Sequence, residues 1–298
     1  MDLDYFVVDV FTETALAGNA LAVVMNTAAL KTEQMQSIAR EFNLSETTFV
    51  ERRPADVESR EGVRVRIFTA QEELNFAGHP TLGTASVLRL NAPEVVREDT
   101  VTLALNAGAV PVRFDADVES SQIQFGEMTQ LDPEFGEELD AGEVARLCGL
   151  RADQLDPALP PQVVSTGTAF AIVALKSHHG LGALNVDQQQ ASGWLRPRGA
   201  RWFYVLAPSG SQAPEWRARM QFNGGEDPAT GSAAGCAISY LVKRGAVASD
   251  KRVHLRQGVE MGRPSELYLT AHLDSAKVSE VRVGGSTVPV AKGRLFLP

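Results

Sequence analysis

The sequence predicts an α+β protein in which one strand-rich unit, built around a central apolar helix, occurs twice. Three observations lead to this prediction: an internal repeat that spans half the chain, strand patterns that recur along both halves, and one prominent apolar helix in each half. The chain has 298 residues, of which 44% are hydrophobic and 22% charged. It is therefore long enough for two domains and has the composition of an average soluble globular protein.

The internal repeat consists of two matched pairs of segments. Residues 79–85, HPTLGTA, align with residues 227–233, DPATGSA, at an offset of 148 (227 − 79). Upstream, residues 18–24, GNALAVV, align with residues 167–173, GTAFAIV, at nearly the same offset of 149 (167 − 18). Two matched pairs in register are hard to obtain by chance. We interpret the chain as a duplicated half with its junction around residues 115–125.

Strand patterns, either alternating or rich in β-branched residues, recur along both halves. In the first half they lie at residues 3–10, 19–25, 46–52, 63–69, 99–105 and 108–114. In the second half they lie at residues 121–126, 161–165, 168–175, 201–206, 217–222, 252–256, 265–272 and 278–284. Helical spacing of apolar residues predicts helices at 32–42, 79–90, 141–148 and 228–244.

The helix expected at residues 228–244 carries almost no charge until its end. A helix that is apolar all round must be surrounded by protein. The small residues in its first turns would let other backbone approach closely. A layer of strands wrapped around a central helix, made twice, accounts for this pattern.

Charge and cysteine content exclude several classes of protein. The net charge of −9 provides no basic face for nucleic acid. The acidic start of the chain does not resemble a secretory signal, and no stretch approaches the roughly 18 apolar residues of a membrane span. Cys148 and Cys236 form no CxxC pair, so both are expected to be buried structural thiols. We expect a cytoplasmic protein without nucleic-acid or membrane partners.

Two helix starts are the candidate binding features. Asp227 followed by Pro228 predicts a helix start, because Asp is a favoured N-cap and Pro is tolerated at the first helical position. His79 followed by Pro80 has the same form with a weaker cap. Helix starts offer unpaired N–H groups and a partial positive charge, and a pseudo-twofold axis would let the two face each other around a small carboxylate. Small residues keep the backbone accessible there: Gly78, Gly83, Gly231 and Ser232.

A structural alternative is that both motifs are only capped helix starts in a duplicated scaffold. The two caps differ in type, with His in one half and Asp in the other. If both residues were only helix caps, the same residue type could serve in both halves. The difference between them therefore favours a functional role.

Further motifs lie along nearly the whole chain. They are Val8–Thr12 with Gly18-Asn19, Asn43–Phe49, Arg66–Thr69 with Phe76–Gly83, Glu226–Ser232, and Gln257-Gly258 with Met261–Ser265. Together they resemble the phenazine-biosynthesis isomerase family, which has the diaminopimelate-epimerase-like fold. These motifs are specific for the family but not for a substrate.

The resemblance implies two pseudo-symmetric domains, each a mostly antiparallel, barrel-like sheet around a central helix, with the active site in the cleft between them. We expect the first domain at residues 1–118, joined by a returning strand at 285–298, and the second at 119–284. The resemblance also implies a homodimer and no cofactor. The family's best-known activity isomerises a dihydro-hydroxyanthranilate by moving a proton from one ring carbon to another.

Carried onto matching positions, the resemblance makes Glu46 the general acid and base, with His79 and Asp227 polarising and holding the substrate. The expected substrate-binding residues are Asn19, Ser45, Gly78, Gly231 and Ser232, the last three through backbone amides at the carboxylate. One carboxylate can both remove and return a proton if burial raises its pKa towards the working pH. From local sequence alone, Glu46 would be an ordinary exposed residue at a strand start.

Two other functions stay open at this point. One is an epimerase or racemase of amino or hydroxy acids. Related epimerases use one cysteine from each half, whereas the motifs Gly78-His79 and Glu226-Asp227 contain none and Cys236 lies well past Asp227. The other is a binding protein that retains the cleft without turnover. The spacing of the histidines indicates no metal site.

Overall fold

The computed structural model describes residues 1–298 except 116–121, 211–214, 223–224 and 298. The chain divides into two compact units, Met1–Thr129 with Gly284–Pro298 (the first unit) and Gln130–Val283 (the second unit). The expected boundary at 118/119 falls on residues outside the described ones. The division lies instead at Thr129/Gln130 and Val283/Gly284, because strand β8 (Gln124–Thr129) still pairs with β7 in the first unit.

The first unit is a sheet closed into a barrel. Its strand order is β1-β2-β3-β4-β6-β7-β8-β18, and β18 also pairs with β1, which closes the ring. The strands are β1 (Asp2–Val10), β2 (Asn19–Val24), β3 (Glu46–Glu51), β4 (Val63–Phe68), β6 (Thr100–Leu105), β7 (Gly108–Phe114) and β18 (Lys277–Phe296), with the short β5 (Glu73–Leu74) beside β4. The returning strand expected at 285–298 is the later part of β18.

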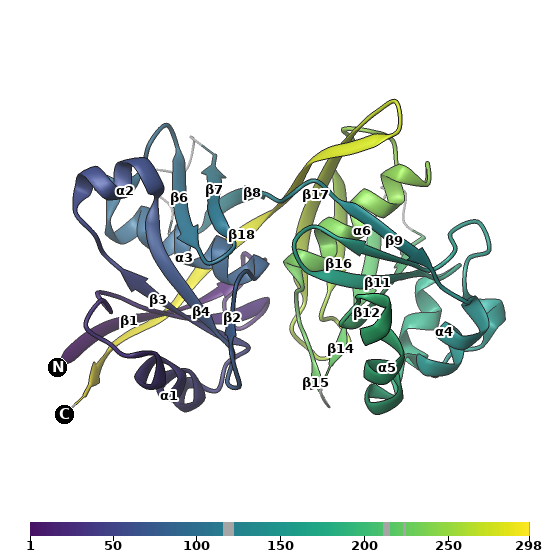
Figure 1. The fold of residues 1–298 in the computed structure, drawn as a ribbon, viewed down its shortest axis with the longest axis horizontal. Coiled ribbons are helices and arrows are strands. Elements are labelled where there is room, and N and C mark those ends of the chain that lie inside the picture. The colour runs from purple at the N-terminus through teal and green to yellow at the C-terminus, as the bar shows by residue number, and fades with distance from the viewer. Residues whose placement is uncertain (116–121, 211–214, 223–224, 298) are drawn as a thin grey trace. The chain divides into compact units, whose positions relative to one another are not determined.

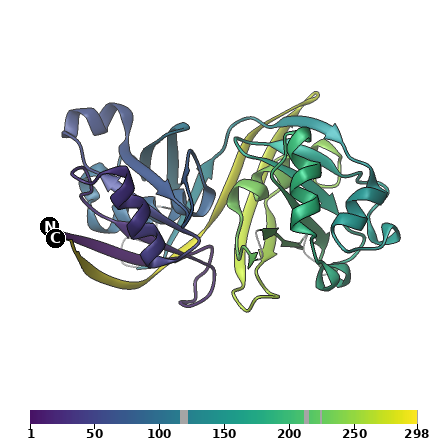
Figure 2. The ribbon, with the colours of Figure 1, turned by 60° about the horizontal axis from the view of Figure 1, so that its bottom comes forward.

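A central helix fills this barrel. Helix α3 (Gly78–Asn91) is buried at every position from Gly78 to Leu88. It packs against β1, β2, β6 and β8. Figure 1 shows its place among the strands of the first unit. Helix α1 (Thr32–Phe42) lies on the outside of the sheet (Figure 2). Its Met35 and Ile38 belong to one buried cluster with Phe49 and Phe68. Two shorter elements complete the unit, α2 (Ala55–Glu61) and the 3₁₀ helix η1 (Pro93–Val95).

The second unit repeats this plan. Its strand order is β18-β17-β16-β13-β12-β11-β10-β9 around helix α6 (Gly231–Lys243), which is buried from Gly231 to Val242. The strands are β9 (Glu134–Glu138), β10 (Gln162–Ser165), β11 (Ala169–Ala174), β12 (Trp202–Pro208), β13 (Glu215–Arg219), β16 (Val253–Gln257) and β17 (Ser265–Asp274), with the small pair β14 (Gln221–Phe222) and β15 (Gly225–Glu226). The remaining helices are α4 (Ala141–Leu147), α5 (Gln188–Leu195) and the 3₁₀ helices η3 (Ala152–Gln154), η4 (His178–Ala183) and η5 (Arg196–Arg198).

The strand pairings confirm the duplication. From β1 to β7, successive neighbours pair antiparallel, parallel, antiparallel, parallel and antiparallel. From β10 to β17 the successive pairings follow the same order. Each central helix occurs at the same point of this series along the chain. Helix α3 lies in the sequence between β4 and β6, and α6 lies between β13 and β16, which are the second parallel pair of each unit.

The repeat has a different register at the central helices from the one expected. Helix α3 begins at Gly78 and α6 at Gly231, an offset of 153 (231 − 78) instead of 148. The ion pairs Arg66–Glu73 and Arg219–Glu226 obey the same offset of 153 (219 − 66 and 226 − 73). His79 therefore matches Ser232, and Asp227 matches Leu74. The similar Pro-containing motifs are displaced by five residues, because Pro80 lies inside the first turn of α3 whereas Pro228 precedes α6.

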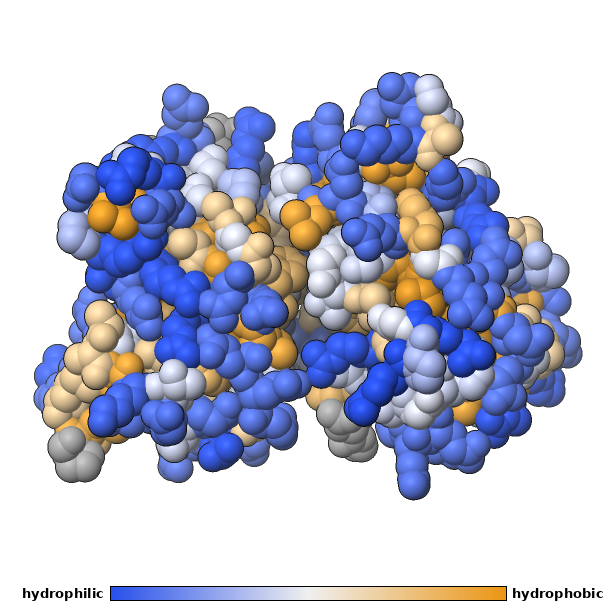
Figure 3. Space-filling model, viewed as in Figure 1, coloured by the Kyte–Doolittle hydropathy of each residue, from blue (hydrophilic) through white to orange (hydrophobic). Residues whose placement is uncertain are grey.

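Hydrophilic side chains cover most of the face shown in Figure 3, with apolar side chains scattered among them. The described part of the chain contains no helix with the length and hydropathy needed to cross a bilayer.

Candidate active site

In the first unit, three expected site residues come together. Asn19 begins β2, Glu46 begins β3, and His79 is the second residue of α3. Strands β2 and β3 are parallel, so both begin at the same edge of the sheet, where α3 also starts. His79 Nδ1 lies 3.2 Å from Asn19 Nδ2, and His79 Nε2 lies 3.3 Å from Glu46 Oε2. His79 is 4% exposed and the Glu46 side chain 16%.

Burial determines the charge of His79. It lowers the pKa of the imidazole to about 3, against the smaller opposing effect of a hydrogen bond with the Ala20 backbone. The proximity of a carboxylate would favour an imidazolium, but the loss of solvation outweighs it. His79 is therefore neutral at physiological pH, which sequence alone did not decide.

The strand that carries Glu46 is tied to the helix that carries His79. The hydroxyls of Thr48 on β3 and Thr84 on α3 lie 2.8 Å apart, and both side chains are fully buried. This contact was missed by sequence reasoning, because a threonine in an apolar run gives no sign of its partner. It fixes the distance between the two elements and hence between the two site residues.

The first turn of α3 presents backbone amides beside His79. Ala77 precedes the helix in an extended conformation without a side-chain cap, and the N–H of Thr81 bonds to the Ala77 carbonyl at 3.3 Å. The amides of Gly78 and His79 precede this bond and are not needed by the helix. Ser45 is a half-buried residue directly before Glu46.

In the second unit, Asp227 lies between β15 and α6 and is not the N-cap expected from its Asp-Pro sequence. The cap position belongs to Thr230, and the helix begins at Gly231. The Thr230 hydroxyl donates to Asp227 Oδ2 at 2.7 Å, and the Asp227 N–H donates to the Met220 carbonyl at 2.9 Å. The carboxylate is thus held ahead of the helix start.

Gly231 and Ser232 are the buried first and second residues of α6. Gln130 Nε2 donates to the Gly231 carbonyl at 2.9 Å, and the Thr166 hydroxyl donates to Gln130 Oε1 at 2.6 Å. A Cβ at Gly235 would lie 1.9 Å from Gln130 Oε1, so this glycine is required for the amide to reach the helix start.

Two bidentate Arg–Glu ion pairs hold the segments before the helices. Arg219 donates to Glu226 at 2.8 and 2.6 Å, and Glu226 directly precedes Asp227. Arg66 donates to Glu73 with the same two distances, and Glu73 lies six residues before His79. The hydrogen bond to Arg66 lowers the pKa of Glu73, and the bond to Glu226 raises the pKa of Arg219.

Gln257, the last residue of β16, is a further part of the second-unit site that sequence reasoning named only as a motif position. Its amide contacts Asp227, Thr230 and Tyr204. The following Gly258 has a φ of +76°, and a Cβ there would lie 2.7 Å from the Pro228 carbonyl. The Gln-Gly sequence thus allows the end of β16 to approach the Asp227 segment.

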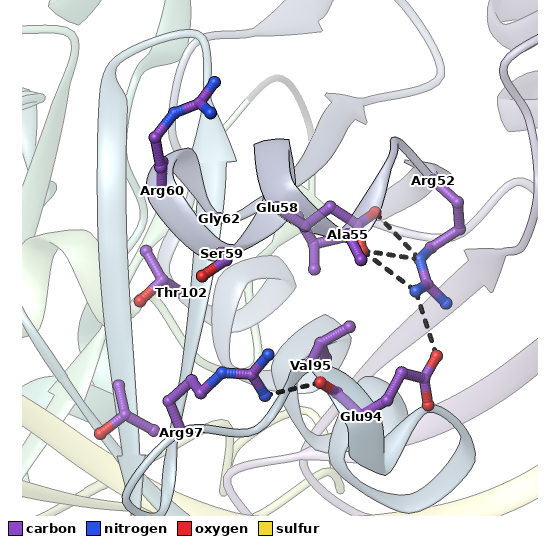
Figure 4. A pocket seen from close by; sticks show the side chains of 12 residues that line it. Arg52, Ala55, Glu58, Ser59, Arg60, Gly62, Glu94, Val95, Arg97 and Thr102 are labelled. Carbon is purple, nitrogen blue, oxygen red and sulfur yellow. Dashed lines mark hydrogen bonds and ion pairs between the residues drawn. The ribbon is translucent and has the colours of Figure 1, made fainter.

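A cavity of about 130 Å³ lies elsewhere in the first unit, at the opposite end of β3 from Glu46. Figure 4 shows Arg52 turned towards Glu58 and Glu94, with which it forms ion pairs at 3.0 and 3.1 Å. A six-residue strand spans about 20 Å, so this cavity is remote from the Glu46–His79 contact. Its paired charges join α2 to η1 and make it a structural feature of the unit.

Cys148 lies outside these clusters, whereas Cys236 borders the Gln130–Thr166 contact of the second unit. Both are buried, and burial raises the pKa of Cys236 to about 11 and that of Cys148 further still. The Cys236 thiol lies 3.5 Å from the Thr166 hydroxyl, within α6 and past its first turn.

Comparison with known proteins identifies the family of the chain. The family model described as phenazine biosynthesis-like protein matches residues 8–293. The chain is 34% identical to trans-2,3-dihydro-3-hydroxyanthranilate isomerase of Pseudomonas aeruginosa, over 98% of this chain and 99% of the relative. It is 35% identical to an uncharacterized isomerase of Pasteurella multocida, over 99% and 94%.

Solved structures show the same fold. A PhzF-family protein of Bacillus anthracis superposes with a TM-score of 0.86 at 23% identity, covering all of both chains. A predicted epimerase of Pseudomonas aeruginosa superposes with a TM-score of 0.83 at 34% identity, covering 99% of this chain and 100% of the other. A probable proline racemase of Agrobacterium radiobacter, at 13% identity, gives 0.65 and covers 99% and 93%. The expected α+β, epimerase-like fold is confirmed.

Proposed function

Because this chain belongs to the phenazine biosynthesis-like family and is an isomerase, we propose that it moves a proton within a small, carboxylate-bearing metabolite of the dihydro-hydroxyanthranilate type. Glu46 is the general acid and base of this proposal, and no cofactor takes part. The observation that carries it is the contact between Glu46 and the buried, neutral His79.

The chemistry asks for one group that first takes and then returns a proton. The Glu46 carboxylate removes a proton from a ring carbon, and the C–H electron pair enters the conjugated system next to it. The protonated carboxyl then delivers the same proton to another ring carbon, so atoms and charge balance without an oxidant or reductant. The largely buried position of Glu46 suits this role, since water would compete for the proton.

His79 supports both states of Glu46 in this proposal. A neutral imidazole has one N–H donor and one acceptor nitrogen, so it can hydrogen-bond either a carboxylate or a carboxylic acid. Asn19, at the other ring nitrogen, keeps the ring oriented. In the second unit, Asp227 and the amides of Gly231 and Ser232 are proposed to bind polar groups of the substrate.

The test is proton NMR in D₂O with trans-2,3-dihydro-3-hydroxyanthranilate, comparing the native chain with Glu46→Gln. We expect the native chain to convert the compound and Glu46→Gln to be slower by about 10²- to 10⁴-fold. Glu51→Gln is the matched control, because Glu51 ends the same strand and contacts Arg64 and Arg66 at 3.9 and 4.0 Å. Equal rates for Glu46→Gln and the native chain would disprove the role of Glu46, and no conversion by the native chain would disprove the substrate.

A further inference from the structure

We propose that Gln257 is a positioning residue for Asp227, which it controls through the hydroxyl group of Thr230. The inference rests on the proposed function, in which Asp227 binds substrate. It assigns a role to a residue of β16 that lies 30 positions from Asp227 in the sequence (257 − 227).

The Gln257 side chain is fully buried and uses both ends of its amide. Its Oε1 accepts the Tyr204 hydroxyl at 2.9 Å and the Thr230 N–H at 3.1 Å. Its Nε2 donates to the Asp227 backbone carbonyl at 2.8 Å and to Thr230 Oγ1 at 2.9 Å. Both oxygen contacts and both amide protons are therefore engaged.

Two backbone groups fix the direction of every bond in this network. The Thr230 N–H can only donate and the Asp227 carbonyl can only accept, so the amide of Gln257 has one possible orientation. Thr230 Oγ1 consequently accepts a hydrogen bond from Nε2. The single proton of that hydroxyl is then directed to Asp227 Oδ2, 2.7 Å away.

Asp227 Oδ2 is therefore always the acceptor in its hydrogen bond with the Thr230 hydroxyl. A donor aimed at a carboxylate oxygen favours the charged form of the carboxyl group. The Thr230 hydroxyl cannot reverse its direction without breaking the bond from Gln257. Tyr204 keeps its own proton for the amide, since burial and the nearby Asp227 charge raise its pKa well above the usual value.

The described residues of the first unit contain no counterpart of this network. At the offset of 153, the residue that matches Thr230 is Ala77 (230 − 153), whose side chain has no hydroxyl. The hydroxyl and its amide partner are therefore a feature of the half that carries Asp227 and not a general requirement for starting the central helix.

A double-mutant cycle tests the route through Thr230. Thr230→Val and Gln257→Met are each expected to lower kcat/KM by about 10- to 100-fold, the usual effect of losing a hydrogen bond to a charged group. If Gln257 acts through Thr230, the double variant is no slower than the slower single variant, and Thr230→Ser restores activity. Losses that multiply in the double variant would overturn the proposal.

A milder pair of variants covers the case in which Gln257→Met does not fold. Tyr204→Phe removes one donor to the Gln257 amide. Tyr240→Phe removes the hydroxyl of an equally buried tyrosine side chain on α6, which donates to the Pro160 carbonyl at 2.8 Å. We expect only Tyr204→Phe to move the acid limb of the pH profile of kcat/KM to higher pH. Equal profiles for the two variants would contradict the proposed route.

A readout without substrate separates this inference from the proposed function. Carbon-13 NMR of the labelled Asp227 carboxyl follows its titration directly. The midpoint is expected to rise in Thr230→Val and in Gln257→Met, and to stay in place in Tyr240→Phe. An unmoved midpoint in Gln257→Met overturns the positioning role even if the enzyme proves to act on a different substrate.

Discussion

The starts of the two central helices show how a duplicated scaffold can carry different chemistry. In the first unit the candidate catalytic side chain, His79, lies inside the first turn of α3 and is controlled by burial. In the second unit Asp227 lies ahead of α6 and is controlled by hydrogen bonds from Thr230 and Gln257. The strand order, the helices and the Arg–Glu pairs are repeated, whereas the polar groups at the helix starts are not.

The repeated parts are therefore structural, and the unmatched parts are the candidates for function. When the two units are aligned at the offset of 153, His79 corresponds to Ser232 and Asp227 corresponds to Leu74. The similar Pro-containing motifs suggested equivalence between His79 and Asp227. The structure shows instead that the two residues occupy different positions of one shared plan.

The largest expected effect concerns the repeated ion pairs. Arg219→Met should lower the free energy of unfolding by about 3 kcal/mol, because it leaves the largely buried Glu226 carboxylate without its partner and the Leu181 carbonyl without its donor. Arg66→Met should cost only about 1 kcal/mol, as for more exposed pairs. The side chains of Arg219 and Glu226 are 9% and 12% exposed, against 16% and 23% for Arg66 and Glu73.

Urea unfolding of both variants measures this difference, and kcat/KM measures its effect on Asp227. We expect Arg219→Met also to slow turnover, since Glu226 directly precedes Asp227. Equal losses of stability in the two variants would show that the repeat is energetically symmetric.

A second, smaller effect is the pH dependence that His79 gives to stability. The pKa of His79 is about 3 in the folded chain, below its ordinary value of 6.5. Between pH 3 and 6.5 the unfolded chain binds a proton at His79 that the folded chain does not bind. The free energy of unfolding therefore has its full value above pH 6.5 and decreases as the pH falls towards 3. From pH 6.5 to 5 the loss is about 2 kcal/mol for one proton.

The matched variant is His79→Gln, which should show a flatter stability curve between pH 6.5 and 5 in urea unfolding. NMR of the imidazole provides the direct check. A His79 ring that titrates between pH 6 and 7 in the folded chain would mean that burial does not control its charge.

The smallest expected effect is that of Cys236. At the offset of 153, its counterpart in α3 is Gly83 (236 − 153), so the thiol has no partner thiol in the other half. Burial and its raised pKa of about 11 should prevent alkylation by iodoacetamide until the chain unfolds. We expect Cys236→Ala to keep kcat within about twofold, since a thiol that stays protonated is a poor base. A loss of activity would revive a thiol-based mechanism.

The sequence predicted those parts of the fold that depend on local patterns. The helix expected at 32–42 is α1, and the apolar helices expected at 79–90 and 228–244 are α3 and α6 with shifted ends. Helix α5 was not predicted, because its sequence QQQASGWL has little apolar periodicity. The structure places Glu46 beside His79, and the catalytic role of both residues stays a prediction. The homodimer, the cytoplasmic location and the absence of a cofactor stay predictions.

Contacts between distant segments explain what the sequence could not show. The Asp-Pro rule assigned Asp227 as a helix cap, since Asp and Pro are both favoured at such positions. The rule cannot detect that the helix begins later, with Thr230 at the N-cap position and hydrogen-bonded to Gln257. The burial that neutralises His79 likewise depends on the whole barrel and not on its neighbours in sequence.

The strand β18 has a consequence for how the chain folds during synthesis. Its residues up to Val283 belong to the second unit, whereas Thr287–Phe296 pair with β1 of the first unit. Residues 284–296 are synthesised after all of the second unit, so β1 lacks this partner strand throughout the synthesis of that unit. The first unit, although its other strands are made first, cannot close its barrel before then. Until then β1 is an open sheet edge, the kind of surface that recruits chaperones or aggregates.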